Sequence, residues 1–271
     1  MLAGLSPARR RLVVGLLSLV VVAALALTAT LTAAFLLRPS EEPAEPAAQE
    51  TPGPVLLVPG YGGGTNGLQT LAERLTAAGR DATVVALPGN GTGDLRASAE
   101  ALDLEVTAAL ARTGADTVDV VGYSAGGLVA RLWVADGGAD VARRVLTLGS
   151  PHHGTRLADL AGEVAPQQCP VGCQQMATDS DLLTELNADD ETPVGPTWVS
   201  IWTTQDETIT PPASSRLDGA VNLPAQSVCA DARINHGQLP RSPLVQEMVV
   251  AELAAGDPVE LAAADCARLS G

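Results

Sequence analysis

The stretch VVGYSAGG at residues 120–127 constrains the fold more than any other part of the sequence. It begins as an apolar run typical of a buried strand, passes Gly122 and Gly126 on either side of Ser124, and continues with helical spacing. A strand that turns sharply into a helix needs neighbours without side chains, because a Cβ at either glycine would collide with the adjoining strand or helix. The stretch therefore predicts a strand–serine–helix turn in an α/β sheet.

Short apolar runs alternate with helical segments along the rest of the chain. We expect strands at 54–60, 81–87, 116–121, 144–148, 197–202 and 220–228, and helices at 68–78, 95–112, 125–134 and 243–253. This alternation favours a mostly parallel central sheet flanked by helices on both faces. Residues 151–195 hold no clear strand, so they are a candidate cap or lid insertion near the carboxyl ends of the strands.

The serine at position 124 has the setting of a nucleophile elbow, in which a strained turn exposes Oγ at the edge of the sheet. In folds with this elbow the partners follow in the order serine, acid, histidine. His236 is the only one of three histidines beyond a later strand, so it is the predicted base. His152 and His153 come too soon after the strand at 144–148, and we expect them to line the cleft or to be structural.

An acid is needed to orient the base. Asp206 stands just past the end of the expected strand at 197–202, which makes it the predicted acid, with Glu207 as the alternative. Asp218 and Asp231 lie further from a strand end.

Two backbone N–H groups are needed to stabilise the oxyanion of such a reaction. One is expected from Ala125, which follows the nucleophile, and the other from Tyr61 in the glycine-rich loop at 59–64. The loop lacks the Gly-Lys-Ser/Thr ending and the GxGxxG spacing of nucleotide-binding loops, so a phosphate cradle is disfavoured.

The N-terminal region differs from the rest of the chain. Three arginines at positions 9–11 precede an uncharged apolar stretch from Leu12 to Leu37. As a helix this stretch would span about 39 Å, more than the hydrocarbon core of a bilayer. Its length favours an uncleaved signal anchor with the catalytic domain outside the membrane, and a cleaved signal with secretion is the alternative. The predicted organisation is a basic stub and anchor at 1–38, a Pro/Glu-rich tether at 39–53 and a domain at 54–271.

The charge balance limits the partners of the domain. The chain has a net charge of −15, and no acidic residue precedes Glu41. Such an acidic domain argues against binding nucleic acid or anionic headgroups, and its ordinary role is solubility.

The four cysteines all follow the apolar stretch, as expected for disulfides in an exported domain. Three pairings are possible, among which a local bridge between Cys169 and Cys173 leaves Cys229 with Cys266. A zinc site is disfavoured, because CPVGC is not a CxxC pair and no histidine stands at ligand spacing.

Taken together, several motifs resemble the α/β-hydrolase superfamily and, more narrowly, the bacterial secreted class 2 lipases and esterases of actinobacterial and Bacillus type. The likeness covers about residues 54–254 and rests on VPGYGG, VDVVGYSAGG, VLTLGSPHHGT, SIWTTQDETITP with SSRLDGAVN, and RINHGQLP. One departure is Pro59-Gly60, where many lipases have His-Gly after the first strand.

This resemblance implies carboxylic ester hydrolysis on a lipid or small ester through an acyl-enzyme, without a metal or organic cofactor. The family's nucleophile, acid and base fall on Ser124, Asp206 and His236, and its oxyanion donors on Tyr61 and Ala125. Two rival functions remain open, which are acyl transfer to an envelope lipid or glycan, and a membrane-anchored binding module without catalysis.

Overall fold

The structure, a computed structural model, describes residues 47–270. The expected anchor at 1–38 lies outside these residues and stays a prediction. None of the helices within residues 47–270 combines the length and apolar character that crossing a membrane requires.

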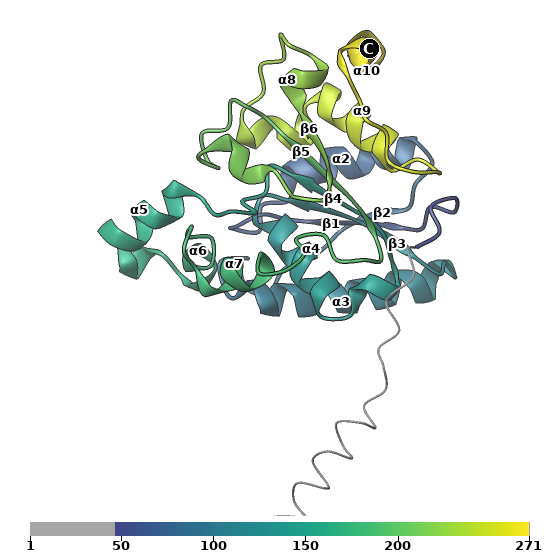
Figure 1. Ribbon diagram of the computed structural model, residues 1–271. Helices are drawn as coiled ribbons and strands as arrows, with labels where there is room; N and C mark the ends of the chain where they lie inside the picture. Colours follow the sequence, from purple (N-terminus) through teal and green to yellow (C-terminus); the bar gives the residue numbers. More distant parts are fainter. Residues whose placement is uncertain (1–46, 271) are drawn as a thin grey trace, which may run out of the picture. The chain divides into compact units, whose positions relative to one another are not determined.

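A six-stranded parallel sheet forms the centre of the domain, with the strand order β2-β1-β3-β4-β5-β6 (Figure 1). The strands are β1 (Val55–Val58), β2 (Ala82–Val84), β3 (Val118–Tyr123), β4 (Ala142–Leu148), β5 (Thr197–Trp202) and β6 (Val221–Pro224). The predicted α/β class with a parallel sheet is therefore confirmed. The stretch 220–228 holds the sixth strand, as expected, and its second half forms the short helix α8 (Ala225–Val228).

Helices cover both faces of the sheet. In Figure 1, α3 (Leu95–Thr113) and α4 (Ala125–Ala135) lie below it, and α2 (Asn66–Ala77) and α9 (Pro243–Glu252) lie above it. The domain ends with α10 (Cys266–Leu269). Short 3-10 turns connect these elements at η1 (Gly138–Asp140), η2 (Pro166–Gln168), η3 (Pro212–Ser215), η4 (His236–Arg241) and η5 (Ala263–Asp265).

The core has one cluster on each side of the sheet. Alternating strand residues divide between them, so Leu56 and Val120 pack toward α3 and α4, while Leu57 and Val121 pack toward α2 and α9. Burying such an aliphatic side chain stabilises the fold by about 1.5–3 kcal/mol. Because both faces are covered, the strands are continuous apolar runs, which explains why their positions are readable in the sequence.

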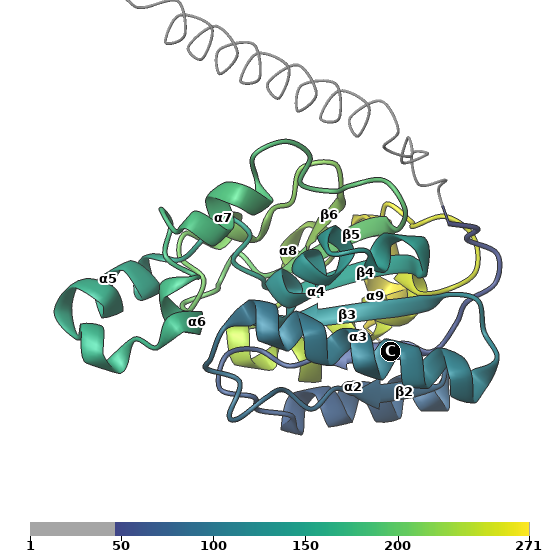
Figure 2. The ribbon, with the colours of Figure 1, turned by 90° about the horizontal axis from the view of Figure 1, so that it is seen from below.

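The region 151–195 contains no strand, as expected, and forms three short helices instead. These are α5 (Arg156–Val164), α6 (Val171–Gln174) and α7 (Asp181–Leu186). Seen from below, α5 lies at the outer edge of the domain, next to α6 (Figure 2).

The last residues of the expected tether contact the domain. Gln49 donates from Nε2 to the carbonyl of Arg143, and its Oε1 accepts from Arg144 and Thr197. Arg143 itself forms a buried ion pair with Asp119 of β3. The described end of the tether is therefore held at the amino-terminal edge of the sheet, opposite the edge at which Ser124 follows β3.

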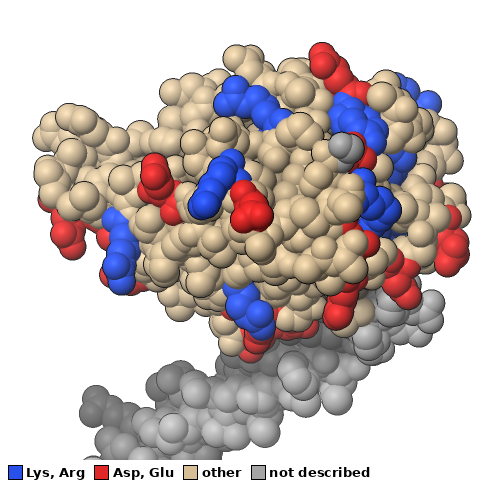
Figure 3. Space-filling model, turned by 90° about the horizontal axis from the view of Figure 1, so that it is seen from above, with Lys and Arg blue, Asp and Glu red and all other residues tan. Residues whose placement is uncertain are grey.

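Charged side chains are spread over the surface. The face seen in Figure 3 carries acidic and basic groups as separate small areas, with no continuous basic area.

Candidate active site

Ser124 joins β3 to α4 in a strained turn. Its φ is 54° and its ψ is −126°, and it is the only non-glycine residue with positive φ among residues 47–270. A Cβ on Gly122 would lie 2.5 Å from the carbonyl oxygen of Gly126, and one on Gly126 would lie 2.3 Å from that of Val58. Both positions therefore exclude any side chain, for the reason predicted from the motif.

His236 and Asp206 meet at the carboxyl ends of the strands. Nδ1 of His236 lies 2.7 Å from Oδ2 of Asp206, and both residues are buried. The other carboxylate oxygen accepts from the backbone N–H groups of Thr208 and Ile209 at 2.9 and 2.8 Å. These bonds fix the carboxylate, and the carboxylate in turn fixes the tautomer and the orientation of the imidazole.

The alternative acids do not reach the histidine. Glu207 and Asp231 are exposed, and Asp218 pairs with Arg216 at the surface. The structure therefore brings Asp206, and none of the other three acids, to His236.

Tyr123 is a site residue that the sequence reasoning did not single out. Its ring centroid lies 5.2 Å from that of His236, and its hydroxyl donates to the His236 carbonyl at 3.3 Å. Burial, and then the charge of Asp206, raise the pKa of Tyr123 to about 12, so the phenol remains neutral at physiological pH. The only feature of the sequence that could have pointed to Tyr123 as a site residue is its position between Gly122 and Ser124.

The glycine-rich loop passes directly beside the nucleophile. A Cβ on Gly60 would lie 2.8 Å from that of Ser124. Among the described residues no oxygen accepts the Tyr61 N–H, and Ala125 starts α4, where the first N–H groups have no partner within the helix. Within the described residues the N–H groups of Tyr61 and Ala125 thus have no partner, and their role as oxyanion donors stays a prediction.

An apolar cavity of about 380 Å³ opens over these groups. Ser124, His236 and Tyr61 line it together with apolar side chains from the cap and from the loop after β5, namely Leu157, Ala158, Ala161, Met176 and Ile209. The candidate cap therefore supplies one wall of the cavity. Sequence reasoning missed these wall residues, because nothing but their place in 151–195 marks them.

The outer side of α5 is also apolar. Leu157, Leu160 and Val164 recur at helical spacing and are 51%, 55% and 73% exposed.

The other two histidines are apart from this cavity. His152 is completely buried, and its Nε2 lies 3.1 Å from Thr147 Oγ1. Burial, followed by the charge of Arg131, holds the pKa of His152 well below its usual range, so the ring is neutral. His153 pairs with Glu191 at 2.8 Å. His152 is thus a structural residue, one of the two roles expected for it.

The cysteines form two disulfides, Cys169–Cys173 and Cys229–Cys266. The first lies in the candidate cap, where Cys173 contributes to the cavity wall. The second ties α10 to the loop after α8.

The parallel sheet, the elbow and the paired histidine and aspartate define an α/β-hydrolase. The chain belongs to the class 2 lipase family, whose pattern matches residues 104–244.

Solved structures share the fold. Aspergillus fumigatus lipase B superposes with a TM-score of 0.64 at 19% identity, covering 84% of this chain and 63% of the fungal one. The mature form of Bacillus licheniformis lipase BlEst2 gives a TM-score of 0.55 at 20% identity over 69% of this chain and 86% of its own. The propeptide form of the same lipase gives a TM-score of 0.60 at 19% identity, covering 83% of this chain and 55% of its own. The chain thus spans less than two thirds of the fungal enzyme, and at these identities the likeness concerns the fold.

Proposed function

We propose that this protein is a serine carboxylic-ester hydrolase, a lipase or esterase that acts through an acyl-enzyme outside the cytoplasmic membrane. The observation that carries the proposal is one cavity that holds Ser124 on its elbow and His236 backed by Asp206. Membership of the class 2 lipase family and the apolar cavity wall support an ester with an acyl chain as substrate.

In the proposed reaction, Ser124 Oγ attacks the ester carbonyl carbon while His236 Nε2 takes the hydroxyl proton. The carbonyl oxygen becomes an oxyanion that accepts hydrogen bonds from the N–H groups of Tyr61 and Ala125. Collapse of the intermediate breaks the bond to the alcohol, which leaves with the proton from His236. Water then attacks the acyl-serine in the same way and releases the carboxylic acid, while Asp206 stabilises the imidazolium throughout.

We place the domain outside the cell on the argument of the N-terminal sequence. The apolar stretch from Leu12 to Leu37, preceded by arginines, supports a single-pass anchor with the following domain exported. Two disulfides in the domain support an oxidising compartment.

Hydrolysis of p-nitrophenyl esters with acyl chains from two to sixteen carbons by the full chain tests the proposal, with Ser124→Ala as control. Turnover that depends on Ser124 is the expected result, and its chain-length profile separates esterase from lipase. Product that forms only when an alcohol acceptor is added would favour acyl transfer. A folded protein without turnover under either condition would favour the binding module.

A further inference from the structure

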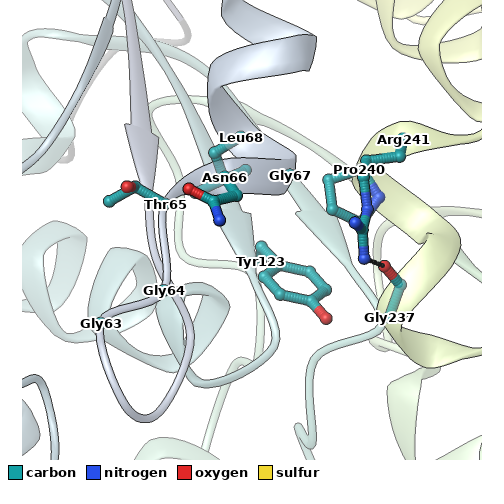
Figure 4. Close-up of a pocket in the computed structure, with 10 residues that line it drawn as sticks. All are labelled: Gly63, Gly64, Thr65, Asn66, Gly67, Leu68, Tyr123, Gly237, Pro240 and Arg241. Atoms are coloured by element: carbon teal, nitrogen blue, oxygen red, sulfur yellow. Dashed lines mark hydrogen bonds between the residues drawn. The ribbon is translucent and has the colours of Figure 1, made fainter.

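A second cavity adjoins the candidate active site. It has a volume of about 510 Å³ and lies between the glycine-rich loop with the start of α2 on one side and the η4 turn on the other (Figure 4). Tyr123 lines both cavities, and Gly237, which lines the second, directly follows His236. The two cavities therefore adjoin at Tyr123, and no residue of the region 151–195 lines the second one.

The lining of this cavity is polar and carries one charge. Arg241 is its only charged residue, and no aspartate or glutamate lines it, although the chain has 31 acidic against 16 basic residues. The net acidity that argues against anionic headgroups for the domain as a whole is therefore reversed in this cavity. Among residues 47–270 no carboxylate pairs with Arg241, whose Nη2 donates to the Gly237 carbonyl at 3.0 Å. The guanidinium is thus held in place with donors to spare.

The opposite wall adds further hydrogen-bonding groups. Within the described residues the carboxamide of Asn66, the first residue of α2, has no hydrogen-bond partner, while the side chain of Thr65 points away from Tyr123 and Arg241 (Figure 4). Figure 4 shows Asn66 and Arg241 on opposite sides of Tyr123. A planar carboxylate is already satisfied by the two parallel N–H groups of one guanidinium. Hydrogen-bond donors on two walls therefore suit a tetrahedral phosphate better, because its oxygens point in several directions.

The two walls are fixed against each other. A Cβ on Gly67 in the first turn of α2 would lie 2.8 Å from Cγ of Pro240, so this turn packs directly on η4. Gly64 lines the cavity and is exposed, and a Cβ on it would meet no atom within 4 Å, so the position tolerates a side chain. The cavity is therefore preformed, with room for a ligand.

We propose that this cavity receives the alcohol part of the ester and selects alcohols that carry a phosphate group. The inference rests on the proposed ester hydrolysis. It assigns the apolar cavity to the acyl chain, and it assigns Arg241 and Asn66 to the phosphate. The leaving alcohol must lie beside the histidine that protonates it. The second cavity is lined by Gly237, the next residue in the chain, and by Tyr123, whose ring lies beside that of His236.

The test compares two monomeric esters that differ only in the phosphate, dihexanoyl glycerophosphate and dihexanoylglycerol, with the full chain. The expected ratio of their kcat/KM values is about tenfold or more in favour of the phosphate ester. Arg241→Gln should bring the ratio close to one, and Arg241→Lys should keep part of it. Gly64→Glu, which adds a negative charge to the lining of the cavity, should reverse it. Because the readout is a ratio, a general loss of folded enzyme does not change it.

Arg216→Gln is the matched control, since Arg216 is exposed, pairs with Asp218 and lines neither cavity. It should leave the ratio unchanged. A ratio near one in the unaltered protein, or a ratio that Arg241→Gln leaves unchanged, would overturn the inference.

A binding measurement separates this inference from the proposed function. Calorimetric titration of Ser124→Ala with glycerol phosphate should show binding that glycerol lacks and that the additional change Arg241→Gln removes. Such binding without any ester hydrolysis would contradict the proposed function alone, and its absence would contradict the cavity assignment. Vesicles of long-chain phosphatidic acid identify the source of the phosphate: hydrolysis of vesicles and monomers indicates a lipid headgroup, and hydrolysis of monomers alone indicates a soluble phosphorylated ester.

Discussion

Nδ1 of His236 lies 2.7 Å from Oδ2 of Asp206, and the same carboxylate accepts two backbone N–H groups through Oδ1. Among the described residues, Oδ2 of Asp206 therefore accepts only from the His236 ring, while Oδ1 accepts from the backbone. This arrangement leaves Nε2 of the imidazole as the atom available to the serine side of the cavity. It also makes the identity of the acid testable, since Glu207 is its neighbour in the sequence.

Asp206→Asn should lower kcat for p-nitrophenyl butyrate by about 10,000-fold, because an amide favours the wrong imidazole tautomer and cannot stabilise the imidazolium. Glu207→Gln is the matched control and should keep kcat within about twofold, since its side chain is exposed and does not contact His236. Steady-state kinetics at pH 8 provide the measurement. A large loss in Glu207→Gln with little loss in Asp206→Asn would reverse the assignment of the acid.

The strained backbone of Ser124 predicts a conflict between stability and catalysis. Ser124→Ala and Ser124→Gly should both be inactive, but the glycine variant should be more stable than the alanine variant by about 1 kcal/mol. The reason is that φ of 54° with ψ of −126° is strained for any residue with a Cβ. Urea unfolding of the two variants measures the difference, and equal midpoints would show that the turn is not strained.

The sequence predicted the parts of the fold that depend on local pattern. The buried parallel strands are continuous apolar runs, and the elbow needs glycines at fixed positions, so both were readable. The end of β6 at Pro224 was not readable within the stretch 220–228, because the apolar residues of α8 continue its pattern. The two cavities were not predictable, since Met176, Ile209 and Arg241 reach the site from separate segments and only tertiary packing brings them together.

Glu252 shows the same limit, because its position on α9 looks like that of a surface residue and the structure buries it completely. Burial raises the pKa of Glu252 to about 7, against about 4.3 in an unfolded chain. Between these values the folded protein keeps a proton that the unfolded chain has lost. The free energy of unfolding due to this residue therefore falls as the pH rises from about 4.3 to about 7.

Glu252→Gln should remove this loss, so the variant should be more stable than the unaltered protein at pH 8, with a smaller difference at pH 5. Glu247→Gln on the same helix is the control of opposite sign. A hydrogen bond from Arg74 lowers the pKa of Glu247, so its loss should slightly destabilise the protein at pH 8. Thermal unfolding at pH 5 and pH 8 measures the stability of both variants against the unaltered protein. Equal pH dependence in Glu252→Gln and the unaltered protein would contradict the assigned burial.

The two disulfides enclose very different lengths of chain and should therefore have different effects. Cys229 and Cys266 are 37 positions apart, so replacing both with serine should lower the free energy of unfolding by about 3–4 kcal/mol, while kcat/KM of the folded protein should change little. Cys169 and Cys173 are 4 apart, so the same replacement should cost about 2 kcal/mol. It should also raise KM, because Cys173 lines the apolar cavity. Urea unfolding and ester kinetics on both double variants check this, and a KM effect confined to the Cys229 and Cys266 variant would contradict the placement of the cap beside the substrate.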